Sequence, residues 1–246
     1  MLRQVVKSDS DRLARDRMGK VRLVIFDVGG TIIEDHGEVI DSFREALVAS
    51  GLTATEAELR ELKGSSKRDV IEKFVERQYG AGAPDNGERT RRAYDDFKRT
   101  LENKFSNGGA KPIKGAHETF AWLKAQQILC ATTTGFYRAV TEAIFDAAGW
   151  QGTFAANICS DDVPEGRPAP YMIFRAMEAA RIGDVRTVLN VGDTPLDLQA
   201  GARAGVLGVI GVLSGIHDAA RLRRESPDHL IASVADLPSL ISAHYF

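Results

Sequence analysis

Three aspartates at or just beyond the ends of apolar segments are the side chains with the clearest capacity for chemistry. Asp27 ends the run VRLVIFD, Asp193 ends the run TVLNVGD, and Asp197 follows four residues later. Such runs are typical of buried parallel strands, whose carboxyl ends share one edge of a sheet. Carboxylates gathered there would suit Mg²⁺, which prefers oxygen ligands. Taken alone, Asp27 could equally cap the turn that follows it.

Hydroxyl groups and an arginine offer partners for a phosphoryl group. Thr132, Thr133 and Thr134 end the run ILCATTTG, just before a helix N-terminus that would favour an anion. Arg167 lies in EGRPAP before another helix start and supplies a cation. Each feature alone has a plainer explanation, since threonines often finish strands and cap helices, and most arginines are solvated. Together with the aspartates they favour a phosphoryl site.

The elements that must position these residues follow an alternating pattern. Short apolar runs predict strands, and amphipathic segments with apolar residues three and four apart predict helices between them. The predicted strands lie near residues 21–27, 127–132, 156–160, 187–193, 207–213 and 229–234. Buried strands alternating with helices predict an α/β fold with a Rossmann-like, doubly wound, mostly parallel sheet.

Residues 37–115 interrupt this pattern because their spacing is almost entirely helical. A helical insert directly after the first strand can close over that strand's carboxyl end, where open α/β sheets bind ligands. We therefore predict a helical cap domain over 37–115, inserted into a core formed by 21–36 and 116–246. Residues 1–20 are expected to form a polar N-terminal extension that carries no chemistry.

The composition excludes several classes of protein. The 246 residues include 32 Lys and Arg against 34 Asp and Glu, and this net charge of −2 argues against nucleic-acid or anionic-membrane partners. No apolar run reaches the ~18 residues of a membrane helix, and the charged N-terminus lacks the apolar region of a signal peptide. We therefore expect a cytoplasmic protein whose two cysteines, Cys130 and Cys159, are reduced and buried.

The motifs FDVGGT, ATTTG, GRP and VGDTPLD occur in an order that resembles the haloacid dehalogenase superfamily of aspartate-nucleophile phosphohydrolases. The likeness extends over almost the whole chain. It implies that Asp27 is the nucleophile and that Asp27, the Gly29 carbonyl and Asp193 hold Mg²⁺, with Asp197 in the outer shell. It also implies that the phosphoryl group is bound by other motif residues, namely Gly30, Thr31, Thr132, Thr133, Thr134, Gly135 and Arg167.

Within this superfamily the chain resembles the phosphonoacetaldehyde hydrolases, or phosphonatases. Gly29 occupies the position of the usual second Asp, where phosphonatases have Ala, and Arg167 before proline replaces the usual lysine. The segment GSSKRDVI is similar to the phosphonatase cap segment that carries a Schiff-base lysine. The resemblance implies that Lys67 attacks the aldehyde carbon of the substrate, and that a homodimer could form through the cap.

Three positions depart from the phosphonatase pattern. Val70 occupies the position of a histidine, Lys63 that of a methionine, and Phe136 that of a tyrosine. The proton relay around the imine is therefore not reproduced residue by residue. Lys67 itself could also be an ordinary solvated lysine, because it begins a charged helical segment.

Gly29 has a chemical consequence that is independent of the resemblance. Expulsion of an alkoxide from a phosphate ester needs a general acid, which contributes about two to four orders of magnitude in rate, and glycine has no such proton. A lysine imine removes the need, because it accepts the electrons of a neighbouring C–P bond. We therefore expect hydrolysis of phosphonoacetaldehyde or a similar aldehyde phosphonate. The alternatives are a phosphatase of a small phosphorylated metabolite, with its acid supplied by the cap, and a non-catalytic phosphate binder.

Overall fold

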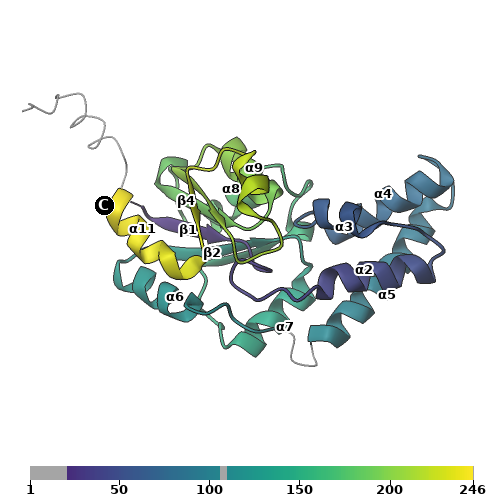
Figure 1. The fold of residues 1–246 in the computed structure, drawn as a ribbon, viewed down its shortest axis with the longest axis horizontal. Coiled ribbons are helices and arrows are strands. Elements are labelled where there is room, and N and C mark those ends of the chain that lie inside the picture. Colours follow the sequence, from purple (N-terminus) through teal and green to yellow (C-terminus); the bar gives the residue numbers. More distant parts are fainter. Residues whose placement is uncertain (1–20, 106–109, 246) are drawn as a thin grey trace, which may run out of the picture.

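A computed structural model of the chain describes residues 21–105 and 110–245 (Figure 1). Its strands form one sheet in the order β3-β2-β1-β4-β5-β6, with every neighbouring pair parallel. The strands are β1 (Leu23–Phe26), β2 (Leu129–Thr134), β3 (Ala156–Cys159), β4 (Val188–Gly192), β5 (Gly208–Val212) and β6 (His229–Ile231). The predicted doubly wound α/β sheet is confirmed. The extension expected over residues 1–20 lies outside the described residues.

Helices cover both faces of the sheet. They are α6 (Ala116–Ala125), α7 (Arg138–Ala148), α8 (Tyr171–Ala179), α9 (Pro195–Ala204), α10 (Ala219–Arg223) and α11 (Leu237–His244). Helices α8 and α9 lie on one face, and α6, α7 and α11 lie on the other (Figure 1).

Strand β1 lies inside the sheet and alternates between the two packed faces. Leu23 and Ile25 join the apolar cluster of α8 and α9, whereas Val24 and Phe26 join the cluster of α6, α7 and α11. All four side chains are fully buried. A strand buried on both faces is apolar at every position, which explains why this segment reads as a continuous apolar run. The following residue, Asp27, is thereby held at the carboxyl edge of the sheet.

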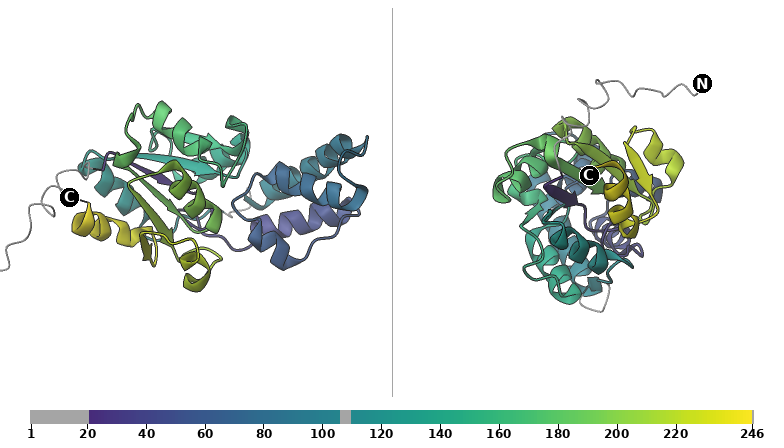
Figure 2. Two further views of the ribbon diagram at one scale, coloured as in Figure 1. Left: turned by 90° about the horizontal axis from the view of Figure 1, so that it is seen from above. Right: turned by 90° about the vertical axis from the view of Figure 1, so that its left-hand side faces the viewer.

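Four further helices lie together beyond the sheet, namely α2 (Glu38–Ala49), α3 (Glu56–Glu61), α4 (Lys67–Tyr79) and α5 (Asn86–Lys104). We call α2–α5 the cap helices. Figure 2 shows them as a group set apart from the sheet. Helices α2 and α5 pack through stacked rings of Phe43 and Phe97, whose centroids lie 4.4 Å apart. The domain boundaries proposed at residues 36/37 and 115/116 remain predictions.

Two expectations concern the chain as a whole. Cys130 and Cys159 are both buried and form no disulfide, as predicted. Among residues 21–105 and 110–245, none of the helices has the length and apolar character needed to cross a membrane.

Candidate active site

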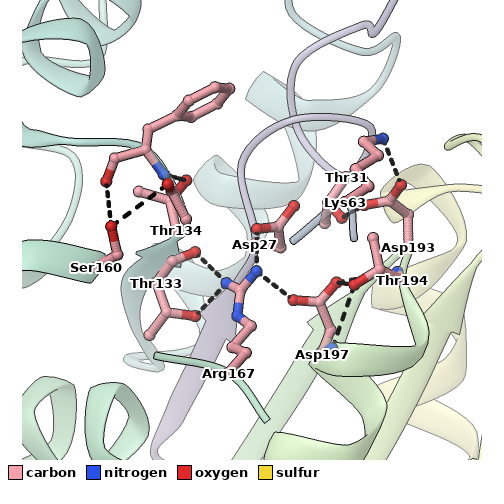
Figure 3. A network of polar contacts seen from close by, with 12 residues as sticks. Asp27, Thr31, Lys63, Thr133, Thr134, Ser160, Arg167, Asp193, Thr194 and Asp197 are labelled. Carbon is pink, nitrogen blue, oxygen red and sulfur yellow. Dashed lines mark hydrogen bonds and ion pairs between the residues drawn. The ribbon is translucent and has the colours of Figure 1, made fainter. Parts of the chain in front are cut away.

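The sheet topology brings the predicted site residues to one edge. Strand β1 lies between β2 and β4, so the residues at the three carboxyl ends become neighbours. Asp27 follows β1, Thr133 and Thr134 end β2, and the loop after β4 carries Asp193. Figure 3 shows Asp27, Thr133 and Asp197 around Arg167, with Asp193 beside Lys63.

Asp27, Asp193 and Asp197 form a buried carboxylate cluster. One oxygen from each lies within 4.8 Å of the other two. Burial disfavours the charged form, so it raises the pKa of Asp193, and it raises the pKa of Asp197 to about 7. A cation at this position would relieve the repulsion, and three carboxylate oxygens are a donor set that suits Mg²⁺.

The start of helix α9 fixes the position of Asp197. Thr194 is the N-cap residue, and its hydroxyl accepts a hydrogen bond from the Asp197 backbone N–H at 3.3 Å. In return, Asp197 Oδ2 accepts hydrogen bonds from the Thr194 backbone N–H at 3.0 Å and hydroxyl at 2.6 Å. This capping box leaves Asp197 Oδ1 directed toward Arg167, at 2.6 Å (Figure 3).

Arg167 is a buried cation between two of the carboxylates. Its guanidinium lies 2.7 Å from Asp27 Oδ1 and also contacts Asp197. The same group donates to the carbonyl and the hydroxyl of Thr133, at 2.6 and 2.9 Å. Only 6% of the residue is exposed. A planar guanidinium fixed in this way holds a positive charge beside Asp27, and such a charge suits the binding of phosphoryl oxygens.

Of the other threonines predicted for the site, two reach it and one does not. Thr31 donates to Asp193 Oδ1 at 3.2 Å and therefore joins the carboxylate cluster. Thr134 lines the cavity that contains Asp27, and its hydroxyl accepts a hydrogen bond from the backbone N–H of Phe136. The Thr132 hydroxyl instead donates to Asn157 on strand β3 at 3.0 Å. The structure thus brings Thr31, Thr133 and Thr134 to the site and directs Thr132 toward the neighbouring strand.

Gly29 and Gly30 lie beneath the cap. Gly29 lines the cavity, and a Cβ atom there would lie 3.4 Å from the ring of Phe136. Gly30 has a φ of +89°, and a Cβ atom there would lie 2.5 Å from Asp193 Oδ2. A side chain at Gly30 would therefore displace a carboxylate of the cluster.

Lys67 reaches the same cavity from the first turn of helix α4. The residue is 5% exposed, its Nζ donates to the Ser65 carbonyl at 3.2 Å, and it lies 5.2 Å from the centroid of the Phe136 ring. Burial, together with the nearby cations Arg167 and Lys63, lowers the pKa of Lys67 to about 8 against the opposing effect of Asp27. The solvated alternative for Lys67 is therefore wrong.

Gly135 allows the cap to approach the core at this point. A Cβ atom at Gly135 would lie 2.4 Å from the Ser65 carbonyl oxygen, 2.8 Å from that of Gly64 and 3.1 Å from Lys67 Nζ. Contacts this short with backbone atoms are not relieved by a rotamer change. The glycine at the end of β2 therefore sets how closely the lysine-bearing loop can lie against the core.

Lys63 was not predicted as a site residue. Its Nζ lies 2.5 Å from an Asp35 oxygen and 3.0 Å from Asp193 Oδ2, and the side chain is 6% exposed. Although burial opposes its charge, the two carboxylates raise the pKa of Lys63 above its ordinary value. The only sequence signal was a lysine in the position of the phosphonatase methionine. Val70, in the position of the phosphonatase histidine, is 2% exposed and packs in the apolar core.

A comparison with protein families identifies the family of this chain. The sequence profile of the haloacid dehalogenase-like hydrolases matches residues 24–212. The chain belongs to this family and is a hydrolase.

Individual relatives place the chain in the phosphonoacetaldehyde hydrolase-like branch. It is 31% identical to the phosphonoacetaldehyde hydrolase of Hahella chejuensis, over 91% of this chain and 86% of the relative. It is 34% identical to that of Latilactobacillus sakei, over 78% of this chain and 76% of the relative. The crystal structure of a phosphonoacetaldehyde hydrolase-like protein from Oleispira antarctica aligns with a TM-score of 0.80 and 26% identity, covering 99% of this chain and 96% of the other.

Proposed function

We propose that the protein hydrolyses the C–P bond of phosphonoacetaldehyde, or of a closely similar aldehyde phosphonate, with Asp27 as nucleophile and Lys67 as the imine-forming amine. The observation that carries the proposal is the presence of both residues in one cavity, which Gly29 and Thr134 also line. Asp27 comes from the strand edge and Lys67 from the cap. A small substrate in this cavity would meet one group from the core and one from the cap.

The proposed reaction begins at Lys67. With a pKa of about 8, roughly one amine in ten is neutral at pH 7 and able to attack a carbonyl. The amine adds to the aldehyde carbon, and the adduct takes up one proton from solvent as water leaves, so the substrate becomes an iminium ion joined to Nζ. This cation lies one carbon away from the C–P bond and can accept its electron pair.

Asp27 then attacks phosphorus in line with that bond. The electron pair of the C–P bond moves toward the iminium and leaves an enamine on Lys67, while the phosphoryl group is transferred to the carboxylate. Arg167 and the Thr31 and Thr133 hydroxyls would bind the equatorial oxygens at this stage. Water next cleaves the aspartyl phosphate, the enamine takes a proton on carbon, and a second water releases acetaldehyde and the free lysine.

Magnesium fits the carboxylate cluster. Asp27 and Asp193, with the Gly29 carbonyl, would hold the ion, and Asp197 would support it through Arg167 and Thr194. When bound, Mg²⁺ would neutralise charge on the phosphoryl oxygens and orient them toward the nucleophile. The geometry supports this assignment, because buried oxygens of Asp27, Asp193 and Asp197 lie within 4.8 Å of one another.

Val70 favours a second candidate function. The phosphonatase histidine is replaced here by a buried apolar side chain, so any acid or base near the imine must come from elsewhere. A phosphatase acting on a small phosphorylated metabolite needs no imine chemistry and would tolerate this replacement. It would need a general acid from the cap, because Gly29 has none.

Product analysis separates the two functions. Wild-type protein, K67R and D27N are incubated with phosphonoacetaldehyde and Mg²⁺, and acetaldehyde and phosphate are measured. We expect equal release of both products by the wild type and none by either variant, since arginine keeps the charge but forms no imine. The exposed lysine of the same helix provides the control, K73R, which should match the wild type. Phosphate-ester cleavage that survives K67R but not D27N, without acetaldehyde release from the phosphonate, would instead support the phosphatase.

A further inference from the structure

Lys63 joins three parts of the molecule through one ammonium group. It lies in the loop between α3 and α4, which we call the cap loop (residues 62–66). Its partners are Asp35, where the chain leaves the core, and Asp193, in the loop after β4. Figure 3 shows the Lys63 side chain directed at Asp193, on the opposite side of the cluster from Arg167. A buried pair of this kind fixes geometry whatever its net contribution to stability.

Lys63 contacts a carboxylate that the proposed metal site would also use. Asp193 Oδ1 accepts the Thr31 hydroxyl at 3.2 Å, and Asp193 Oδ2 faces the Lys63 ammonium at 3.0 Å. A divalent ion bound to Asp193 would therefore lie beside a fixed positive charge on the same carboxylate. In a buried site of low polarity, this repulsion is strong.

The charges of the site set the size of the conflict. Four carboxylates, from Asp27, Asp35, Asp193 and Asp197, face two permanent cations, Lys63 and Arg167. A divalent ion at Asp193 would add to the positive charge that Lys63 already places beside this carboxylate. Asp35 is the second carboxylate partner of the Lys63 ammonium. The ammonium can keep this partner when Asp193 binds a metal ion.

The cap loop is seated on the same part of the core. A Cβ atom on Gly64 would lie 2.8 Å from the Thr194 hydroxyl, and Thr194 directly follows Asp193. With the loop in this position, the cavity that contains Asp27 and Lys67 has a volume of about 20 Å³, enough for a single water molecule. The cavity must therefore widen before any organic substrate can reach Lys67, and Lys63 and Gly64 of the cap loop are among its lining residues.

We propose that Lys63 is the counter-ion of Asp193 in the metal-free protein and that a divalent metal displaces it, so that metal binding loosens the cap loop and admits the substrate. This inference rests on the metal site of the proposed function. Metal binding and loop docking oppose each other, and the two effects are reciprocal by thermodynamic linkage. A coupling of ordinary size changes each equilibrium by about 5- to 150-fold.

Titration calorimetry with MgCl₂ tests the competition on the whole protein. We expect K63M to bind Mg²⁺ at least about fivefold more tightly than the wild type, and D35N to bind it more weakly, because the ammonium is left to Asp193 alone. The matched control is E61Q, which breaks the exposed pair between Glu61 on α3 and Arg221, 3.2 Å apart, without touching the cluster. Its affinity should equal that of the wild type. Unchanged or weaker binding by K63M, or tighter binding by D35N, overturns the inference.

Hydrogen exchange of residues 62–66 tests the loop. We expect Mg²⁺ to increase exchange there in the wild type and in E61Q, and to have no effect in K63M, in which the loop is already released from Asp193. Unchanged or slower exchange in the metal-bound wild type overturns the proposal even if the affinities agree. If neither the wild type nor any variant binds a divalent ion, the metal site of the proposed function is refuted, and the inference fails with it. If the wild type and all variants bind the metal with equal affinity, only the competition between Lys63 and the metal is refuted.

Discussion

Replacement of Lys67 by methionine should stabilise the protein at neutral pH. The buried amine has a pKa of about 8, below the ordinary value of 10.5, because burial opposes its charge. The folded protein therefore binds fewer protons than the unfolded chain between pH 8 and 10.5. The free energy of unfolding therefore rises with pH across that interval. Below pH 8 the amine of the folded protein is charged, and the destabilisation caused by its burial reaches its full size.

The magnitude follows from the difference between the two pKa values. Each pKa unit corresponds to about 1.4 kcal/mol, so the charged amine destabilises the fold by about 3 kcal/mol at pH 7. Methionine has a similar length and no charge, so K67M should unfold with a free energy about 3 kcal/mol higher than the wild type. For a chain of this size, this corresponds to about 6–12 °C in melting temperature.

Urea unfolding at several pH values measures this effect. The difference between K67M and wild type should be greatest at or below pH 7 and should decrease between pH 8 and 10.5. K73M replaces an exposed lysine of the same helix and should lie within about 0.5 kcal/mol of the wild type throughout. A K67M protein no more stable than the wild type at pH 7 would refute the reasoning, because the amine would then be charged and stabilised by Asp27.

Three further predictions follow from the same geometry. The kcat/KM for phosphonoacetaldehyde should rise with pH and level off above about pH 8, because Lys67 must be neutral to attack the aldehyde. Its pKa is set by burial and by the charges of Asp27, Asp35, Lys63 and Arg167. A flat profile from pH 6.5 to 9 would contradict this prediction. G135A should reduce the rate at least about tenfold, because a Cβ atom at this position meets the Ser65 carbonyl. G183A should not reduce it, because a Cβ atom there meets nothing within 4 Å. Equal rates for the two variants would show that catalysis does not depend on the close approach of the cap to Gly135. R167M should lower the free energy of unfolding by about 3–5 kcal/mol at pH 7, because two buried carboxylates lose their cation; urea unfolding with less than about 1 kcal/mol of change would show that the pair is dispensable.

The strand-end residues were predictable because the topology follows from local patterns. A run such as VRLVIFD ends at the edge where ligands bind in any doubly wound sheet, so Asp27 and Asp193 could be paired from sequence alone. The threonine run shows where this reasoning stops. Successive side chains of a strand point to opposite sides, and the pattern of three threonines does not say which of them faces Arg167.

The places of Lys63 and Lys67 in the site depend on tertiary contacts that sequence spacing does not encode. Lys67 was located through a family resemblance, and its burial depends on the close approach of Ser65 to Gly135. Lys63 pairs with Asp193 across 130 residues, and nothing local distinguishes it from the exposed lysines of the cap helices.

Reductive trapping tests the proposed reaction most directly. Wild-type protein is mixed with phosphonoacetaldehyde, reduced with borohydride, digested and mapped by mass spectrometry. The proposed function predicts a reduced adduct on Lys67, absent from K67R and formed in D27N, which can still make the imine but cannot cleave the C–P bond. Release of phosphate and acetaldehyde with no adduct on Lys67, or with the adduct on Lys63 instead, would contradict it.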